Sequence, residues 1–129
     1  MRLMEVIEQC ELEPKNLTVE ELFHVIIHEL GFPSKIKGTR YLEEFFALAY
    51  ERYENPCDIE IMKLYGIIAA NNNTTVASVS RQMLYAITVA WDKGNHDLQN
   101  QLFIYTVNPE TCKPTLQELV AVLMEILKE

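Results

Sequence analysis

Glycine is scarce in this chain, with four residues out of 129. The sequence has no glycine-rich loop of the kind that cradles phosphate groups, and no Gly-x-Ser-x-Gly elbow that would present a serine nucleophile. Cys10, Cys57 and Cys112 are odd in number and too widely separated for a metal-binding spacing, so we expect small buried hydrophobic residues or free thiols. No cysteine and histidine are spaced as a nucleophile and its base. We therefore predict a protein that is not an enzyme, with no cofactor and no small-molecule substrate.

Long apolar runs are missing as well. No stretch approaches the roughly 18 to 20 apolar residues that cross a bilayer. The first residues, MRLMEVIEQCELEP, carry acidic side chains throughout instead of the basic and then apolar pattern of a signal peptide. We expect a cytoplasmic protein without membrane contact. Hydrophobic residues make up 49% of the chain, enough at this length for one domain with a core of its own.

Basic residues are outnumbered, with 11 lysines and arginines against 19 acidic residues and a net charge of −8. Such a charge weakens long-range attraction to nucleic-acid phosphates. The acidity is concentrated in residues 1–30 and 43–60, whereas Lys35, Lys37 and Arg40 occupy a segment, residues 31–42, that contains no acid. Residues 61–109 contain three basic and two acidic residues. An acidic solvated face is therefore compatible with a DNA-binding face elsewhere.

Every strong periodic signal along the chain has the helical period. Thr18 with Glu21, and Thr115 with Glu118, form capping-box patterns that open two helices, while Gly31 ends the first of them. No repeat, linker or low-complexity tract interrupts the pattern. The sequence predicts one compact all-α domain, residues 1–129, of six or slightly more helices, with residues 1–17 as a short extension. We expect helical segments at residues 3–10, 18–30, 41–53, 58–65, 66–70, 75–93, 97–105 and 115–127.

The segment NTTVASVSRQMLYAITVAWDKGN, residues 73–95, predicts a turn and a long amphipathic helix. Side-chain oxygens of Asn73, Thr74 and Thr75 can cap the helix, and Gly94 stands where a left-handed C-terminal cap is expected. A short apolar stretch from Gly66 precedes the turn. Residues 66–94 therefore have the outline of a helix-turn-helix, whose second helix would enter the major groove of DNA. The outline alone is weak evidence, because most helix pairs joined by a short turn never touch DNA.

Two groups of ionisable residues invite a functional interpretation. His24 and His28 lie four residues apart on one helical face, but HVIIHE is not the His-Glu-x-x-His order of zinc enzymes, and no third ligand is evident. We expect packing or hydrogen-bonding histidines there and no metal. Glu43 and Glu44 are adjacent, so they point about 100° apart on a helix, and we expect a solvated face instead of paired catalytic carboxylates.

The strings IHELGFPSKIKG, RYLEEFFALAYE, NNTTVASVSRQMLYAITVAWDKGN and LFIYTVNPETCKPTLQEL occur in this order. In this series the chain resembles the C-terminal effector domain of the sporulation-initiation response regulators of endospore-forming Firmicutes, from about Leu22 to Leu127. The resemblance implies a six-helix all-α fold, a helix-turn-helix that reads double-stranded DNA, and tandem or homodimeric association through the last helix. Family members also carry a phosphoacceptor receiver domain. Only about twenty residues precede the shared region here, so we expect either a domain fragment or a protein that acts without phosphorylation.

The resemblance and the helical pattern together give a set of candidate DNA contacts. Arg81 is expected on the exposed face, where it can bind guanine through two hydrogen bonds. An acidic residue and two arginines of the family fall at Ser80, Arg81 and Leu84, so only Arg81 is retained, and family lysines fall at Ala70 and Asn71. The base-contacting candidates are Ser78, Ser80, Arg81, Leu84 and Tyr85; the phosphate-contacting candidates are Lys35, Lys37, Thr74, Thr75 and Lys93.

A second hypothesis follows from the net charge and from the loss of the charged residues that the family has in its helix-turn-helix. The fold would be kept while DNA binding is lost, and the domain would pair with another protein through Leu84, Tyr85 or the last helix. An exposed leucine on a base-reading face is unusual and fits a protein contact at least as well.

Overall fold

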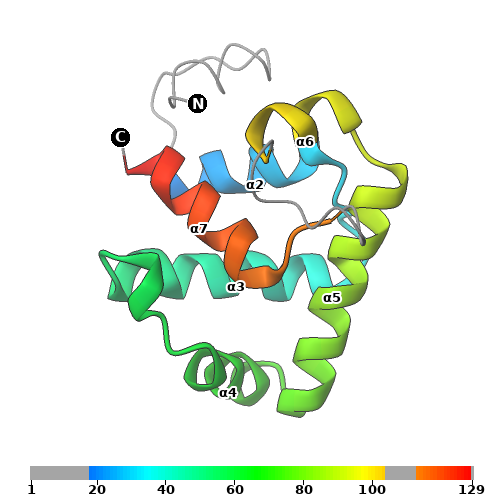
Figure 1. The fold of residues 1–129 in the computed structure, drawn as a ribbon. Coiled ribbons are helices and arrows are strands. Elements are labelled where there is room, and N and C mark those ends of the chain that lie inside the picture. Colours follow the sequence, from blue (N-terminus) through cyan, green and yellow to red (C-terminus); the bar gives the residue numbers. More distant parts are fainter. Residues whose placement is uncertain (1–17, 104–112, 129) are drawn as a thin grey trace.

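The structure is a computed structural model that describes residues 18–103 and 113–128. These residues form α-helices and one 3-10 helix, without a strand, so the all-α prediction is confirmed (Figure 1). The predicted helix at residues 3–10 lies outside the described residues. The elements are α2 (Val19–Leu30), α3 (Lys37–Arg52), the 3-10 helix η1 (Pro56–Asp58), α4 (Ile61–Asn71), α5 (Val76–Lys93), α6 (His96–Leu102) and α7 (Leu116–Leu127).

Helix α3 runs through the middle of the molecule, between α7 and α4, and α5 stands across its amino-terminal end (Figure 1). One cluster of buried apolar side chains joins the α-helices. In it the rings of Phe23 and Phe46 stack in parallel with centroids 3.7 Å apart, which ties α2 to α3. The apolar faces expected from the helical period are largely the buried ones, because burying such a stripe is what stabilises an amphipathic helix. Val76, Leu48, Tyr53 and Leu116, also expected there, are only partly buried.

The predicted helix ends at both capping motifs are confirmed. Thr18 accepts a hydrogen bond from the Glu21 amide at the start of α2. Thr115 and Glu118 exchange both bonds of a capping box at the start of α7. Gly31 ends α2 with a φ of 109°, a left-handed conformation that glycine adopts without steric cost. Cys57 is an exposed free thiol, one of the two expectations for the cysteines, and Cys10 and Cys112 lie outside the described residues.

Two glycine predictions are wrong. Gly66 does not separate the two helical segments expected at residues 58–65 and 66–70, because α4 runs without interruption from Ile61 to Asn71. One helical glycine costs about 1 kcal/mol relative to alanine, and the burial of Leu64 and Ile68 on either side outweighs it. Gly94 is extended and not left-handed, with φ −86° and ψ −161°. It is required for a close approach instead, since a Cβ atom there would lie 2.3 Å from the Leu30 carbonyl oxygen.

A buried glutamine, Gln99, stabilises the close approach of Gly94 to the end of α2. The side-chain amide of Gln99, on α6, donates hydrogen bonds to the carbonyl oxygens of Leu30 at 2.8 Å and of Ala90 at 2.7 Å. These carbonyls belong to the last turns of α2 and α5, and the Ala90 carbonyl also accepts from the Gly94 amide. The backbone amide of Asn95 also donates to the Leu30 carbonyl. Gln99 therefore holds the ends of α2 and α5 together, and α6 fixes how the carboxyl end of α5 sits on α2.

Candidate nucleic-acid interface

Helices α4 and α5 form a helix-turn-helix. The turn occupies residues 72–75, and its Asn73 has a φ of 53°, a left-handed conformation that asparagine tolerates better than most residues. The Thr74 amide donates back to the Ala69 carbonyl at 2.9 Å, and Thr75 accepts from the Ser78 amide as the N-cap of α5. The first helix of the motif is α4, which begins at Ile61, five residues earlier than the expected start at Gly66.

The turn is fastened to α3 by Glu44. Its carboxylate accepts hydrogen bonds from the side-chain amides of Asn71 at 2.8 Å and Asn72 at 2.9 Å. Asn72 also donates to the Ile68 carbonyl, which closes the end of α4. The expectation that Glu43 and Glu44 are merely solvated is therefore wrong, because both are partly buried and hydrogen-bonded, Glu43 to His24. These hydrogen bonds could not be predicted from local sequence patterns, because Glu44 and Asn71 are 27 residues apart.

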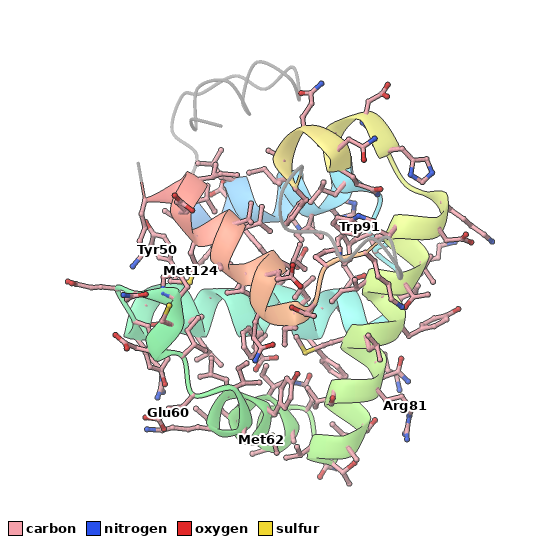
Figure 2. The ribbon with its side chains drawn as sticks, in the orientation of Figure 1. Tyr50, Glu60, Met62, Arg81, Trp91 and Met124 are labelled. Atoms are coloured by element: carbon pink, nitrogen blue, oxygen red, sulfur yellow. The ribbon has the colours of Figure 1, made fainter. Side chains whose placement is uncertain are left out.

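The outer face of α5 carries the main base-contacting candidates. Arg81 is exposed and points away from the body of the domain (Figure 2). Leu84 and Tyr85 are each 55% exposed, which is high for large hydrophobic side chains. The opposite face of α5 is buried in the core. Arg81, Leu84 and Tyr85 therefore share one solvent-facing surface, which we call the outer face of α5.

Two candidate serines lie on the flanks of α5. Ser78 and Ser80 are partly buried. The Ser80 hydroxyl hydrogen-bonds to the Tyr65 phenol of α4. Burial raises the pKa of Tyr65 above its usual 10.0, and the bond to Ser80 offsets part of this increase. Ser80 therefore faces Tyr65 of α4 at the flank of α5.

The phosphate-contacting candidates are spread over two helices. Lys35 and Lys37 are exposed at the start of α3, whose N-cap Ile36 offers no side-chain hydrogen bond to the free amides. Gly38, next in the chain, packs against the α5 backbone, since a Cβ atom there would lie 1.9 Å from the Gln82 carbonyl oxygen. The structure therefore brings the basic start of α3 to the middle of α5.

The other three candidates occupy the two ends of α5. Thr74 and Thr75 precede its first residue, and Thr75 already serves as the cap. Lys93 is its last residue. Eighteen residues at 1.5 Å each make α5 about 27 Å long. Lys93 and the two threonines are therefore not brought together, and they would meet phosphates well apart from each other.

Sequence reasoning missed Lys113. Its ammonium group donates a hydrogen bond to the Thr88 hydroxyl at 2.7 Å, which places a cation beside the outer face of α5. Thr88 in turn donates to the Leu84 carbonyl, so the contact lies one turn beyond Leu84. Lys113 lies two residues before Thr115, the N-cap of α7. Its position beside α5 depends on a contact across 25 residues that no local pattern reveals.

The family comparison agrees with this geometry. Residues 23–127 match the family model described as sporulation initiation factor Spo0A C terminal. The match covers most of the chain. This protein belongs to the Spo0A C-terminal family. The resemblance seen in the sequence is confirmed, and the chain is a regulatory domain of the sporulation-initiation type, in a family of transcription regulators and not of enzymes. No helix among residues 18–103 and 113–128 is long and apolar enough to cross a membrane.

Proposed function

We propose that this Spo0A C-terminal domain is a sequence-specific DNA-binding regulator that reads the major groove with α5. The observation that carries the proposal is the solvent-facing Arg81 on the second helix of a well-capped helix-turn-helix in a domain of this family. A guanidinium group can donate two hydrogen bonds to guanine O6 and N7, the commonest specific contact. Ser78, Leu84 and Tyr85 would contact neighbouring base edges, with apolar contact to thymine methyl groups as the contribution of Leu84. Ser80, engaged with Tyr65, would contribute at the edge of this surface.

Phosphate contacts would position α5 without reading sequence. Lys35 and Lys37 would act together with the free amides at the start of α3, because unpaired N–H groups and the helix dipole both favour an anion. Thr74, Thr75 and Lys93 would contact phosphates at the two ends of α5. We add Lys113 to this set, because it places positive charge beside the outer face of α5. Distributed along and beside α5, these positive charges would offset the acidity elsewhere in the chain.

The two kinds of contact predict different mutant behaviour. Arg81→Ala should cost about 1–3 kcal/mol on a selected duplex and relax specificity at one base pair. Lys37→Ala should weaken selected and random duplexes about equally, since phosphates carry no sequence information. Fluorescence anisotropy on both duplexes measures the two effects. Equal behaviour of the two variants on both duplexes would show that the roles are wrongly assigned.

A protein-interaction module is the second candidate function. The exposure of Leu84 and Tyr85 favours it, because large apolar side chains on one face mark many protein contacts. In this case Leu84→Glu would abolish association, with another protein or with a second copy, without unfolding the domain. Sedimentation of the wild type and the variant at several concentrations distinguishes self-association from DNA binding.

A further inference from the structure

Three potential metal ligands meet where α2 packs beside α3. His24 Nδ1 lies 2.6 Å from Glu43 Oε1, which joins the two helices. The rings of His24 and His28 are in edge contact, with centroids 4.4 Å apart. One ligand atom from each of His24, His28 and Glu43 falls within 4.8 Å of the other two. The third ligand that was not evident in the sequence is thus Glu43, supplied by a helix 19 residues away.

The donor set suits a divalent transition metal such as zinc. Two imidazole nitrogens and one carboxylate oxygen bind Zn²⁺ at about 2.0–2.2 Å, and in a tetrahedral site such ligand atoms are about 3.3 Å apart. His24 Nδ1 and Glu43 Oε1 are closer than this, at 2.6 Å. All three ligand atoms lie within 4.8 Å of one another, so the observed distances are on both sides of the tetrahedral value or close to it. Both histidines are exposed, so small rotations of their side chains can close the difference. Glu43 is more buried, at 28% side-chain exposure against 54% for His24, and is a fixed anchor for them.

The local charge also favours a cation. Glu20 and Glu21 lie one turn before His24 on α2 and line a surface hollow with it. Among the residues that the structure describes, none that lines this hollow is a lysine or an arginine. A dipositive ion would therefore enter a surface of negative potential, and solvent could supply the remaining coordination positions. The alternative to a metal site is a simple hydrogen bond between His24 and Glu43. Such a bond requires neither the surrounding acidic residues nor His28.

We propose that His24, His28 and Glu43 form a zinc-type site that links α2 to α3. The ion lies between His24 Nδ1 and Glu43 Oε1 in place of their hydrogen bond, with the imidazole proton of His24 carried on Nε2, gains His28 as a third ligand and keeps water at its open position. This site is separate from the outer face of α5, and the proposal does not depend on DNA binding. Its direct consequence is a metal-dependent increase in the stability of the α2–α3 pair, because an ion that binds only the folded state stabilises it.

Calorimetric titration of the full chain with Zn²⁺, under reducing conditions, tests the proposal. We expect one ion per chain and at least a tenfold weaker affinity in both His28→Ala and Glu43→Gln. His96→Ala removes the third histidine, which lies on α6, and should leave the affinity unchanged. Cys57→Ser is a second control, because an exposed thiol can also bind zinc. Equal affinity of the wild type and His28→Ala would overturn the proposal, and so would the absence of binding.

A second readout separates the site from incidental binding. At a hundredfold excess of free Zn²⁺ over Kd, the melting temperature should rise by roughly 5–10 °C in the wild type and in His96→Ala. His28→Gln, which keeps a polar side chain on the exposed face of α2, should fold normally and show no rise. An equal rise in His28→Gln and the wild type would place the ion elsewhere and contradict the assignment.

Discussion

Replacing Gly38 by alanine is expected to destabilise the domain by about 3 kcal/mol, at the upper end of the usual cost of overpacking. Gly38 lies at the crossing of α3 and α5, where a Cβ atom would stand 1.9 Å from the Gln82 carbonyl oxygen and 2.5 Å from its carbon. Both atoms are backbone, so no side-chain rotation relieves the clash and the helices must separate. Urea denaturation followed by circular dichroism measures the loss. DNA affinity should fall with it, because this contact sets the position of α5.

Gly66→Ala is the matched control. Gly66 is also in a helix, but a Cβ atom there meets nothing within 4 Å. The alanine should therefore raise the free energy of unfolding by about 0.5–1 kcal/mol, as expected from helix propensity alone. Equal effects of the two substitutions would contradict the close approach of α3 and α5.

Gln99→Leu is expected to cost about 2–3 kcal/mol of stability. The leucine is similar in size but removes both hydrogen bonds to the carbonyl oxygens of Leu30 and Ala90, and buried acceptors that lose a partner cost about 1–3 kcal/mol. Each carbonyl keeps one backbone donor, from Asn95 and Gly94 respectively, so the loss stays below that of two orphaned groups. Thermal and urea denaturation report the change.

The comparison for this prediction is Gln101→Leu. Gln101 lies on the same helix but is exposed, so its replacement should change stability by less than about 0.5 kcal/mol. If Gln99→Leu were as stable as the wild type, the buried amide would not be what holds the ends of α2 and α5.

The helices could be predicted from the sequence because their signals are local. The caps at Thr18 and Thr115 and the apolar face of α5 each depend on residues within a few turns, and the structure has them as expected. The glycines were harder, because their role depends on neighbours distant in sequence. Gly94 has the local pattern of a left-handed cap, yet it is fixed by contact with the end of α2, more than sixty residues earlier.

The interface was predictable only in part for the same reason. The exposure of Arg81, Leu84 and Tyr85 follows from the period of one helix, and the structure agrees. Lys113 beside Thr88 and Glu43 beside His24 depend on contacts between helices, which no local pattern contains.

The most direct test of the central claim, that α5 and its basic surroundings bind DNA, is the salt dependence of binding. The folded wild-type domain would be titrated against a labelled selected duplex by fluorescence anisotropy at about 50 and 200 mM salt. With three to four phosphate contacts, counterion release predicts saturable binding that weakens roughly a hundredfold between these salts. No binding at the lower salt by a folded domain would contradict the account and favour a protein-interaction role.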